Sequence, residues 1–414
     1  MERGAAPRSG NGTAFFLIFL TCFQFLCNAA HIQQTALYLV INPYVAMFPL
    51  LFIWLAALGF YGHYADRNFL IAWLVLMTLQ TLFLQTFSIS PGFPVNLFKS
   101  LQFFWGPLVL IPIFLGLFRI SGAPRDVTHT THVYIKGLCW IASGISLFEI
   151  VAVRLLHVPA LSLPWIHDLY VGIHRPFGLP DYPQPNAILL ALLFWFSFLY
   201  QVPGNAHRVV TLVTLSLTLG ITGVIIFLAL IPLWTRRPFL FSGMGFAALG
   251  VLVATATLGA QYSTGGPLEK FDLAYLDRLG YLLNKVLRLY LVQFNTDNFL
   301  FGAPLISPLA TSGISHDWAY FDVFYVYGFV GVAAYILLYG LVSYLACPSS
   351  ATVSMRLYFV LVVLIANFHY GTLNYYVGQF LFSTLAALRI RDMYPIPNRA
   401  PSRASPAGLP AMES

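Results

Sequence analysis

The chain has 414 residues, of which 59% are hydrophobic and only 8% are charged. Soluble domains carry about 25% charged residues, so this composition excludes an ordinary soluble protein. The net charge of +7 is spread over the loops and forms no basic face, which argues against nucleic acid as a partner. Because backbone groups in lipid must pair within their own segment, we expect an all-α, polytopic membrane helical bundle.

Apolar runs of roughly 17–25 residues can cross a bilayer core of about 30 Å. In chain order we predict spans at about 14–30, 43–62, 69–87, 102–120, 134–155, 186–202, 208–234, 239–261, 319–345, 353–370 and 371–388. The run at 208–234 is long for one crossing and has Gly220 and Gly223 near its middle. We expect it to be two short helices that meet near Gly220, which gives about 11–12 transmembrane helices. The four cysteines match no metal-site spacing, and we interpret them as small apolar residues.

Charge placement supports this split. With two helices in 208–234, both termini are cytoplasmic, and 14 of the 21 basic residues lie on the cytoplasmic side. The long loops at about 157–185 and 262–318 then both lie in the periplasm, and the second contains a predicted amphipathic helix at 269–294. We therefore expect one transmembrane domain over 1–391 and a disordered cytoplasmic tail at 392–414.

The first long loop ends in the sequence IHRPFGLPDYPQPN at 173–186, whose four prolines limit backbone freedom. Arg175 offers planar donors that match phosphate oxygens, so we interpret it as a site for an anion, most simply a phosphate on a lipid carrier. The alternative is an interfacial arginine that reaches lipid headgroups. His174 is a weaker candidate, since a loop histidine is more often solvated.

The second long loop supplies His316 and Asp317 shortly before a predicted helix. A near-neutral imidazole can accept a proton from a sugar hydroxyl, and Asp317 could orient it. The alternatives are a polar residue at a helix end and a helix cap. The functional prediction requires this loop and the Arg175 loop to meet.

Three basic residues lie near one another on the predicted amphipathic helix, namely Arg278, Lys285 and Arg288. One of the two arginines could share a pyrophosphate with Arg175; the alternative is a solvated helix face. Glu149 lies in an apolar segment, where an acid is costly, and we expect either an ion pair with Arg154 or a role in transport. No P-loop, Asp-x-Asp pair or HExxH motif is present, so we expect no cofactor or metal.

Residues 173–345 resemble the bacterial O-antigen polymerase and O-antigen ligase superfamily. The matching stretches are Arg175-Pro176-Phe177-Gly178 with Pro185-Asn186, then Arg278, Tyr281 and Asn298-Phe299-Leu300-Phe301-Gly302, then His316-Asp317 with Gly328 and Gly331. Two departures are Ile221-Thr222-Gly223, where the family often has serine-arginine-glycine, and Asp317, where the family has asparagine.

The resemblance implies a metal-independent, inverting glycosyltransferase of the bacterial inner membrane, with a donor glycan on undecaprenyl pyrophosphate. Arg175 and either Arg278 or Arg288 would bind the pyrophosphate, and His316 with Asp317 would activate the acceptor hydroxyl. Weaker substrate contacts are expected from His174, Asn186 and Lys285.

A polymerase of O-antigen or exopolysaccharide is the leading function. An O-antigen ligase acting on lipid A-core is the alternative, and a transporter or flippase is disfavoured by the nearly charge-free helices. Membrane lipids, a chain-length regulator and a repeat-unit flippase are the further expected partners.

Overall fold

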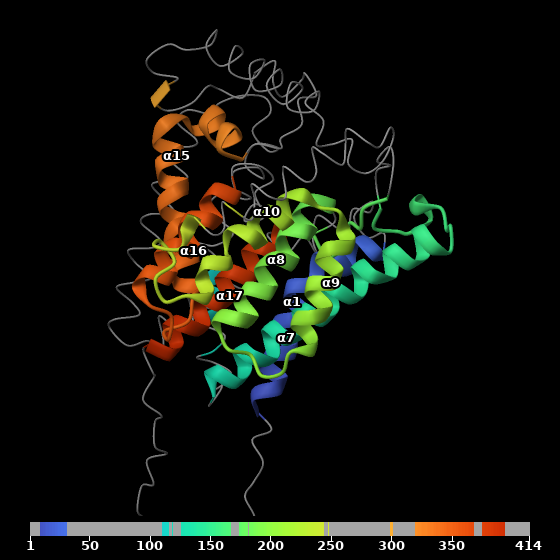
Figure 1. Ribbon diagram of the computed structural model, residues 1–414, viewed down its shortest axis with the longest axis horizontal. Coiled ribbons are helices and arrows are strands. Elements are labelled where there is room, and N and C mark those ends of the chain that lie inside the picture. The colour runs from blue at the N-terminus through green and yellow to red at the C-terminus, as the bar shows by residue number, and fades with distance from the viewer. Residues whose placement is uncertain are drawn as a thin grey trace, which may run out of the picture.

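The computed structural model describes residues 9–30, 110–115, 118, 126–166, 174–180, 182–243, 247, 299–300, 319–367 and 375–393. Within these residues all regular elements are helices, which confirms the helical class (Figure 1). The spans predicted at 43–62 and 69–87, the amphipathic helix at 269–294 and most of the tail lie outside the described residues, as do large parts of 102–120 and 239–261.

The elements in chain order are α1 (Ser9–Ala29), α7 (Val127–Ile150), the π-helix η3 (Val151–Leu155), the 3-10 turn η4 (Ala160–Ser162), α8 (Pro183–Leu199), α9 (Ala206–Thr218), α10 (Ile221–Ala229), the 3-10 turn η5 (Ile231–Trp234), α15 (Ala319–Ala346), α16 (Val353–Ala366) and α17 (Tyr376–Met393). Several of them lie side by side in one bundle (Figure 1).

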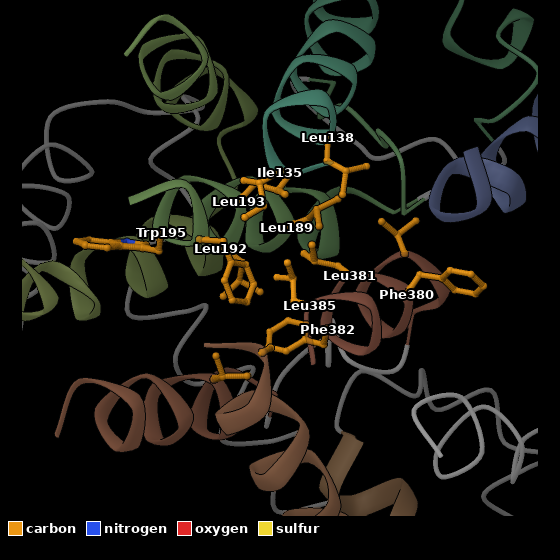
Figure 2. Packing of buried hydrophobic residues seen from close by; sticks show 14 of the residues in the cluster. Ile135, Leu138, Leu189, Leu192, Leu193, Trp195, Phe380, Leu381, Phe382 and Leu385 are labelled. Atoms are coloured by element: carbon orange, nitrogen blue, oxygen red, sulfur yellow. The ribbon is translucent and has the colours of Figure 1, made fainter. Parts of the chain in front are cut away.

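Helix α8 forms the core of the described bundle. Fifteen of its 17 residues are buried, as expected for a helix that is apolar on all sides. Its leucines lie between side chains of α7 and α17 in Figure 2. A proline at the first helical position, Pro183, starts α8 three residues before the expected boundary.

Helix α7 and the π-helix η3 make one continuous element. The carboxylate of Asp126 caps its start by accepting a hydrogen bond from the His129 backbone N–H at 2.8 Å. This start lies seven residues before the predicted span, at Val127 instead of residue 134. Single π-turns within helices often occur at functional sites, and η3 lies beside the Arg175 loop, as described below.

The predicted break in segment 208–234 is confirmed. Helix α9 ends at Leu219, which has a left-handed backbone (φ 56°), and α10 begins at Ile221 after an extended Gly220. A left-handed residue commonly ends a helix. The segment is therefore two short helices and not one continuous helix.

Contacts with α8 show that α9 and α10 run in opposite directions. At the start of α9, Arg208 Nε donates to Ser197 Oγ in the last turn of α8 at 2.9 Å. After the turn, Gly223 lies against Ala187 near the beginning of α8, so closely that an added Cβ would be 2.5 Å from the Ala187 backbone. At the end of η5, the Trp234 ring again contacts the last turns of α8. The chain thus returns to the end of α8 from which it left.

Helix α15 is not the single straight helix that was expected over 319–345. Gly328 has a non-helical backbone (φ 63°, ψ −163°). The rings of Tyr320 and Tyr335 lie 5.7 Å apart, whereas a straight helix would separate these residues by roughly 22 Å. The first segment of α15 therefore folds back on the second. The Tyr320 hydroxyl also donates to Leu364 O, in the last turn of α16, at 2.6 Å.

The helix ends fall into two groups. Seven of the nine lysines and arginines that the structure describes lie toward one end, here called the basic end: Lys136, Arg208, Arg236, Arg237, Arg356, Arg389 and Arg391. Hydrogen bonds join the helices there, for example from the Tyr200 hydroxyl to Ala346 O at 2.8 Å. The opposite end, here called the loop end, carries the other two, Arg154 and Arg175.

Helices α1, α7, α9 and α16 run from the basic end to the loop end, and α8, α10 and α17 run back. Among the described residues, two helical stretches are long and apolar enough to cross a membrane, Val127–Leu155 and Gly328–Ala346. Four further apolar helices are shorter, at Asn11–Cys27, Pro183–Leu199, Thr222–Trp234 and Val353–Ala366.

Candidate functional site

The carboxylate of Glu149 fixes the Arg175 loop to the end of α7. The Glu149 side chain is fully buried. It accepts hydrogen bonds from the backbone N–H groups of Phe177 at 2.7 Å and Gly178 at 2.9 Å, and from Trp165 Nε1 at 2.8 Å. Hydrogen bonds to a carboxylate are roughly twice as strong as neutral ones. A single buried acid therefore holds two consecutive amides of the loop.

Gly178 and Asn186 also help to hold the Arg175 loop in place. Gly178 has a φ of 61°, and an added Cβ would lie 2.1 Å from Asn186 Oδ1. Asn186 is fully buried, and its Nδ2 donates to Ser146 Oγ at 2.9 Å and to Pro176 O at 3.2 Å. The asparagine thus connects the loop, α8 and α7. Its predicted contact with substrate stays a prediction.

Arg154 joins the same loop to the last turn of α9. Its Nε donates to His174 O at 2.7 Å, its Nη2 donates to the same oxygen, and its Nη1 donates to Leu217 O at 2.9 Å. The expected ion pair with Glu149 is not formed between these two described residues. A separation of five residues places side chains roughly 140° apart around an α-helix, so the two side chains contact different parts of the loop.

Arg175 and His174 both lie on this supported segment. Arg175 is partly buried, and its charge lies close enough to Arg154 for the two guanidinium groups to repel each other. His174 Nε2 lies 3.7 Å from Glu149 Oε2, and the imidazole stacks on Phe177 with ring centroids 6.3 Å apart. The loop therefore presents Arg175 from a backbone that is fixed on both sides.

The predicted partners of Arg175 lie outside the described residues: His316, Asp317, Arg278, Lys285 and Arg288. The described chain resumes at Ala319, three residues after His316. The hydrogen bond from Tyr320 to Leu364 O places this point at the loop end of α16. At the same end, Tyr182 of the Arg175 loop contacts Tyr375 just before α17, with ring centroids 6.3 Å apart.

Sequence reasoning missed the part that Glu149 and Trp165 play in this site. Glu149 was recognised as an unusual acid, but the expected partner was a nearby cation and not the backbone of a distant loop. The available signal was the combination of a buried acid with a loop rich in proline, whose unpaired amides need an acceptor.

The chain matches no protein-family model, no curated protein and no solved structure. In the part of the chain that the structure describes, no group of three or more histidine, cysteine, aspartate or glutamate side chains could hold a metal ion. The functional conclusion therefore depends on the residues and contacts given above.

Proposed function

We propose that this chain is a polysaccharide polymerase of the bacterial inner membrane. It joins undecaprenyl-pyrophosphate-linked repeat units at the periplasmic face, for O-antigen or exopolysaccharide. The observation that carries the proposal is that the Arg175 loop and the chain leaving the His316 loop reach the same end of the helices. Residues 173–186 and 316–317 can act on one substrate only with this arrangement.

The rigidity of the Arg175 loop also supports the proposal. Binding groups act best when other residues hold them in their productive geometry. Glu149, Asn186 and Arg154 hold this loop with hydrogen bonds from three directions. A surface arginine that only contacts lipid headgroups would need no such support.

In the proposed reaction, an acceptor hydroxyl attacks the anomeric carbon of the lipid-linked glycan. The bond between that carbon and the pyrophosphate oxygen breaks, and the anomeric configuration inverts. His316, oriented by Asp317, takes the hydroxyl proton. Arg175 and either Arg278 or Arg288 stabilise the charge on the departing lipid pyrophosphate.

An O-antigen ligase would use the same donor and differ only in its acceptor. A polysaccharide flippase is the less favoured alternative. Transporters commonly place charged or discontinuous segments at mid-membrane, whereas the charged groups of the described helices lie mainly toward the two ends. The proposal includes a location in the inner membrane with both termini in the cytoplasm, since the two long loops then lie on the periplasmic side where the reaction takes place.

Two substitutions in a strain that lacks the native gene test the proposal. We expect Arg175→Ala and His316→Ala each to abolish long polymer while the protein still accumulates in the membrane. Arg236→Ala, which removes an exposed cation at the basic end, should leave chain length unchanged. Gel analysis of lipid-linked glycan provides the measurement. Normal chain lengths in either loop variant would refute the catalytic assignment, and accumulation of full-length lipid-linked polymer would identify a ligase.

A further inference from the structure

Buried polar side chains lie in a row between α15 and α17. Tyr335 and Tyr339 of α15 are fully buried, and their ring centroids lie 4.4 Å apart. The Tyr335 hydroxyl accepts a hydrogen bond from Nδ2 of Asn367, which ends α16. The Tyr339 hydroxyl accepts one from Nε2 of Gln379, near the start of α17, at 3.4 Å. Uncharged polar groups of three helices therefore meet inside the bundle.

Ser343 of α15 and Ser383 of α17 continue this row by one helical turn. Each follows, by four residues, one of the two side chains in the Tyr339–Gln379 hydrogen bond, and residues with this spacing lie on the same face of a helix. Further along both helices, Arg389 Nη1 of α17 donates to Tyr344 O of α15. The two helices therefore run side by side in the same direction, and both serines lie in their interface.

Three polar atoms of this row have no hydrogen-bond partner in the part of the chain that the structure describes: Ser343 Oγ, Ser383 Oγ and Asn367 Oδ1. Both serines are fully buried, and Asn367 is 2% exposed. Burying a polar group without a partner is costly, and nearly all such groups in proteins bond to protein atoms or to ordered water. Three of them in one interface indicate a shared small ligand.

Other helical hydroxyls of this chain show that the two serines are exceptional. The hydroxyls of Ser146, Thr131 and Thr214 each donate to the carbonyl oxygen four residues earlier, at 2.7–2.8 Å. A helical serine can satisfy its own hydroxyl in this way. Neither Ser343 nor Ser383 makes this bond, so their hydroxyls are available to a ligand between the helices.

We infer that the interface of α15 and α17 binds a short row of water molecules, between Asn367 and the two serines. The ligand is small, because each of the six side chains in the row is at most 2% exposed. It is uncharged, because none of these six side chains carries a charge. Water both donates and accepts, and a buried water typically bonds to about three otherwise unpaired groups. The inference does not depend on the proposed polymerase function.

Radiolytic footprinting of the full chain in phosphatidylcholine nanodiscs tests this inference. A brief X-ray pulse converts water to hydroxyl radicals, which oxidise a buried side chain only where a water molecule lies against it, and mass spectrometry gives the oxidation rate of each tyrosine. Tyr134 is the matched control, because it is equally buried but its hydroxyl pairs with Thr21 Oγ1 at 2.9 Å. We expect Tyr335 and Tyr339 to be oxidised several times faster than Tyr134. Equal protection of all three tyrosines would overturn the inference.

Two serine variants assign the water to this row. Valine in Ser343→Val or Ser383→Val occupies space beside the former hydroxyl and offers no hydrogen bond, so each change should displace water and lower the oxidation rate of Tyr339 to that of Tyr134. The control is Thr384→Val, because Thr384 is next along α17 but faces Tyr134, and it should leave the Tyr339 rate unchanged. Fast oxidation of Tyr339 in both serine variants would refute the assignment. A variant that fails to fold would expose Tyr134 as well, and the wild-type comparison then still decides.

Discussion

Arginine serves different purposes at the two ends of this molecule. At the basic end, Arg208 and Arg389 donate to carbonyl groups at the ends of α8 and α15, where the helix dipole favours positive charge. At the loop end, a buried carboxylate organises the backbone, and Arg154 and Arg175 lie together on the result. The neighbours of an arginine, and not its presence alone, therefore distinguish an arginine that caps a helix end from one that is a candidate ligand contact.

The strongest test of this comparison makes the same chemical change at each end. Glu149→Gln replaces a buried acceptor of three N–H bonds with an amide, and we expect a loss of about 3 kcal/mol in unfolding free energy. Asp126→Asn removes a carboxylate from an exposed cap at the basic end, and asparagine caps helices equally well, so a change within about 0.5 kcal/mol is expected. Thermal or denaturant unfolding in detergent measures both. Equal effects would mean that Glu149 does not organise the loop end.

A second test alters the backbone of the loop. Gly178→Ala places a Cβ in a left-handed position against Asn186, and we expect it to cost about 2 kcal/mol. The control is Gly144→Ala, at an exposed position on α7 with no atom near the added Cβ, which should be neutral or stabilising by up to about 1 kcal/mol. Hydrogen exchange at residues 174–180 should increase only in the first variant. Unchanged exchange there would contradict the proposed rigidity.

The smallest effect is expected for maleimide labelling of the four native cysteines. Cysteines added elsewhere can therefore report on topology without interference from the native ones. All four are buried, and burial raises the pKa of the Cys347 thiol to about 12. The reactive thiolate is therefore scarce near pH 7.5, and a membrane-impermeant maleimide should leave the wild type unlabelled.

Two added cysteines then compare the faces. Ala206→Cys lies at the exposed start of α9, at the basic end, and should react only after the membrane is opened. Ser263→Cys, in the second long loop, should react in intact spheroplasts. Labelling of both from the same face would mean that residues 208–234 cross the membrane once.

Part of this fold could be predicted from the sequence. The break near Gly220 followed from three signals: a run too long for one crossing, glycines near its middle and the placement of Arg236 and Arg237. The structure confirms the break and shows why glycine is needed, since Gly223 lies against the Ala187 backbone. The apolar pattern and the placement of the charges were sufficient to predict the break, because each is a property of the whole segment 208–234.

The reversal at Gly328 could not be predicted in this way. Residues 319–345 form a mainly apolar run whose charged residue, Asp322, lies near its start, and isolated glycines in such a run are usually tolerated within a helix. The reversal depends on tertiary contacts, such as those of Tyr320 with Tyr335 and Leu364. The partners of Glu149 were missed for a similar reason, because Phe177 and Gly178 lie 28 and 29 residues further along the chain.

The hairpin of α9 and α10 has a consequence for how such a protein sits in a bilayer. The 13 residues of α9 extend roughly 20 Å, less than the hydrocarbon thickness of about 30 Å, so each arm is shorter than a full crossing. Because the chain returns to its starting side, the orientation of every later segment is the same whether the arms pass through a thinned bilayer or stop partway. The depth of this hairpin can therefore vary without inverting the remainder of the protein.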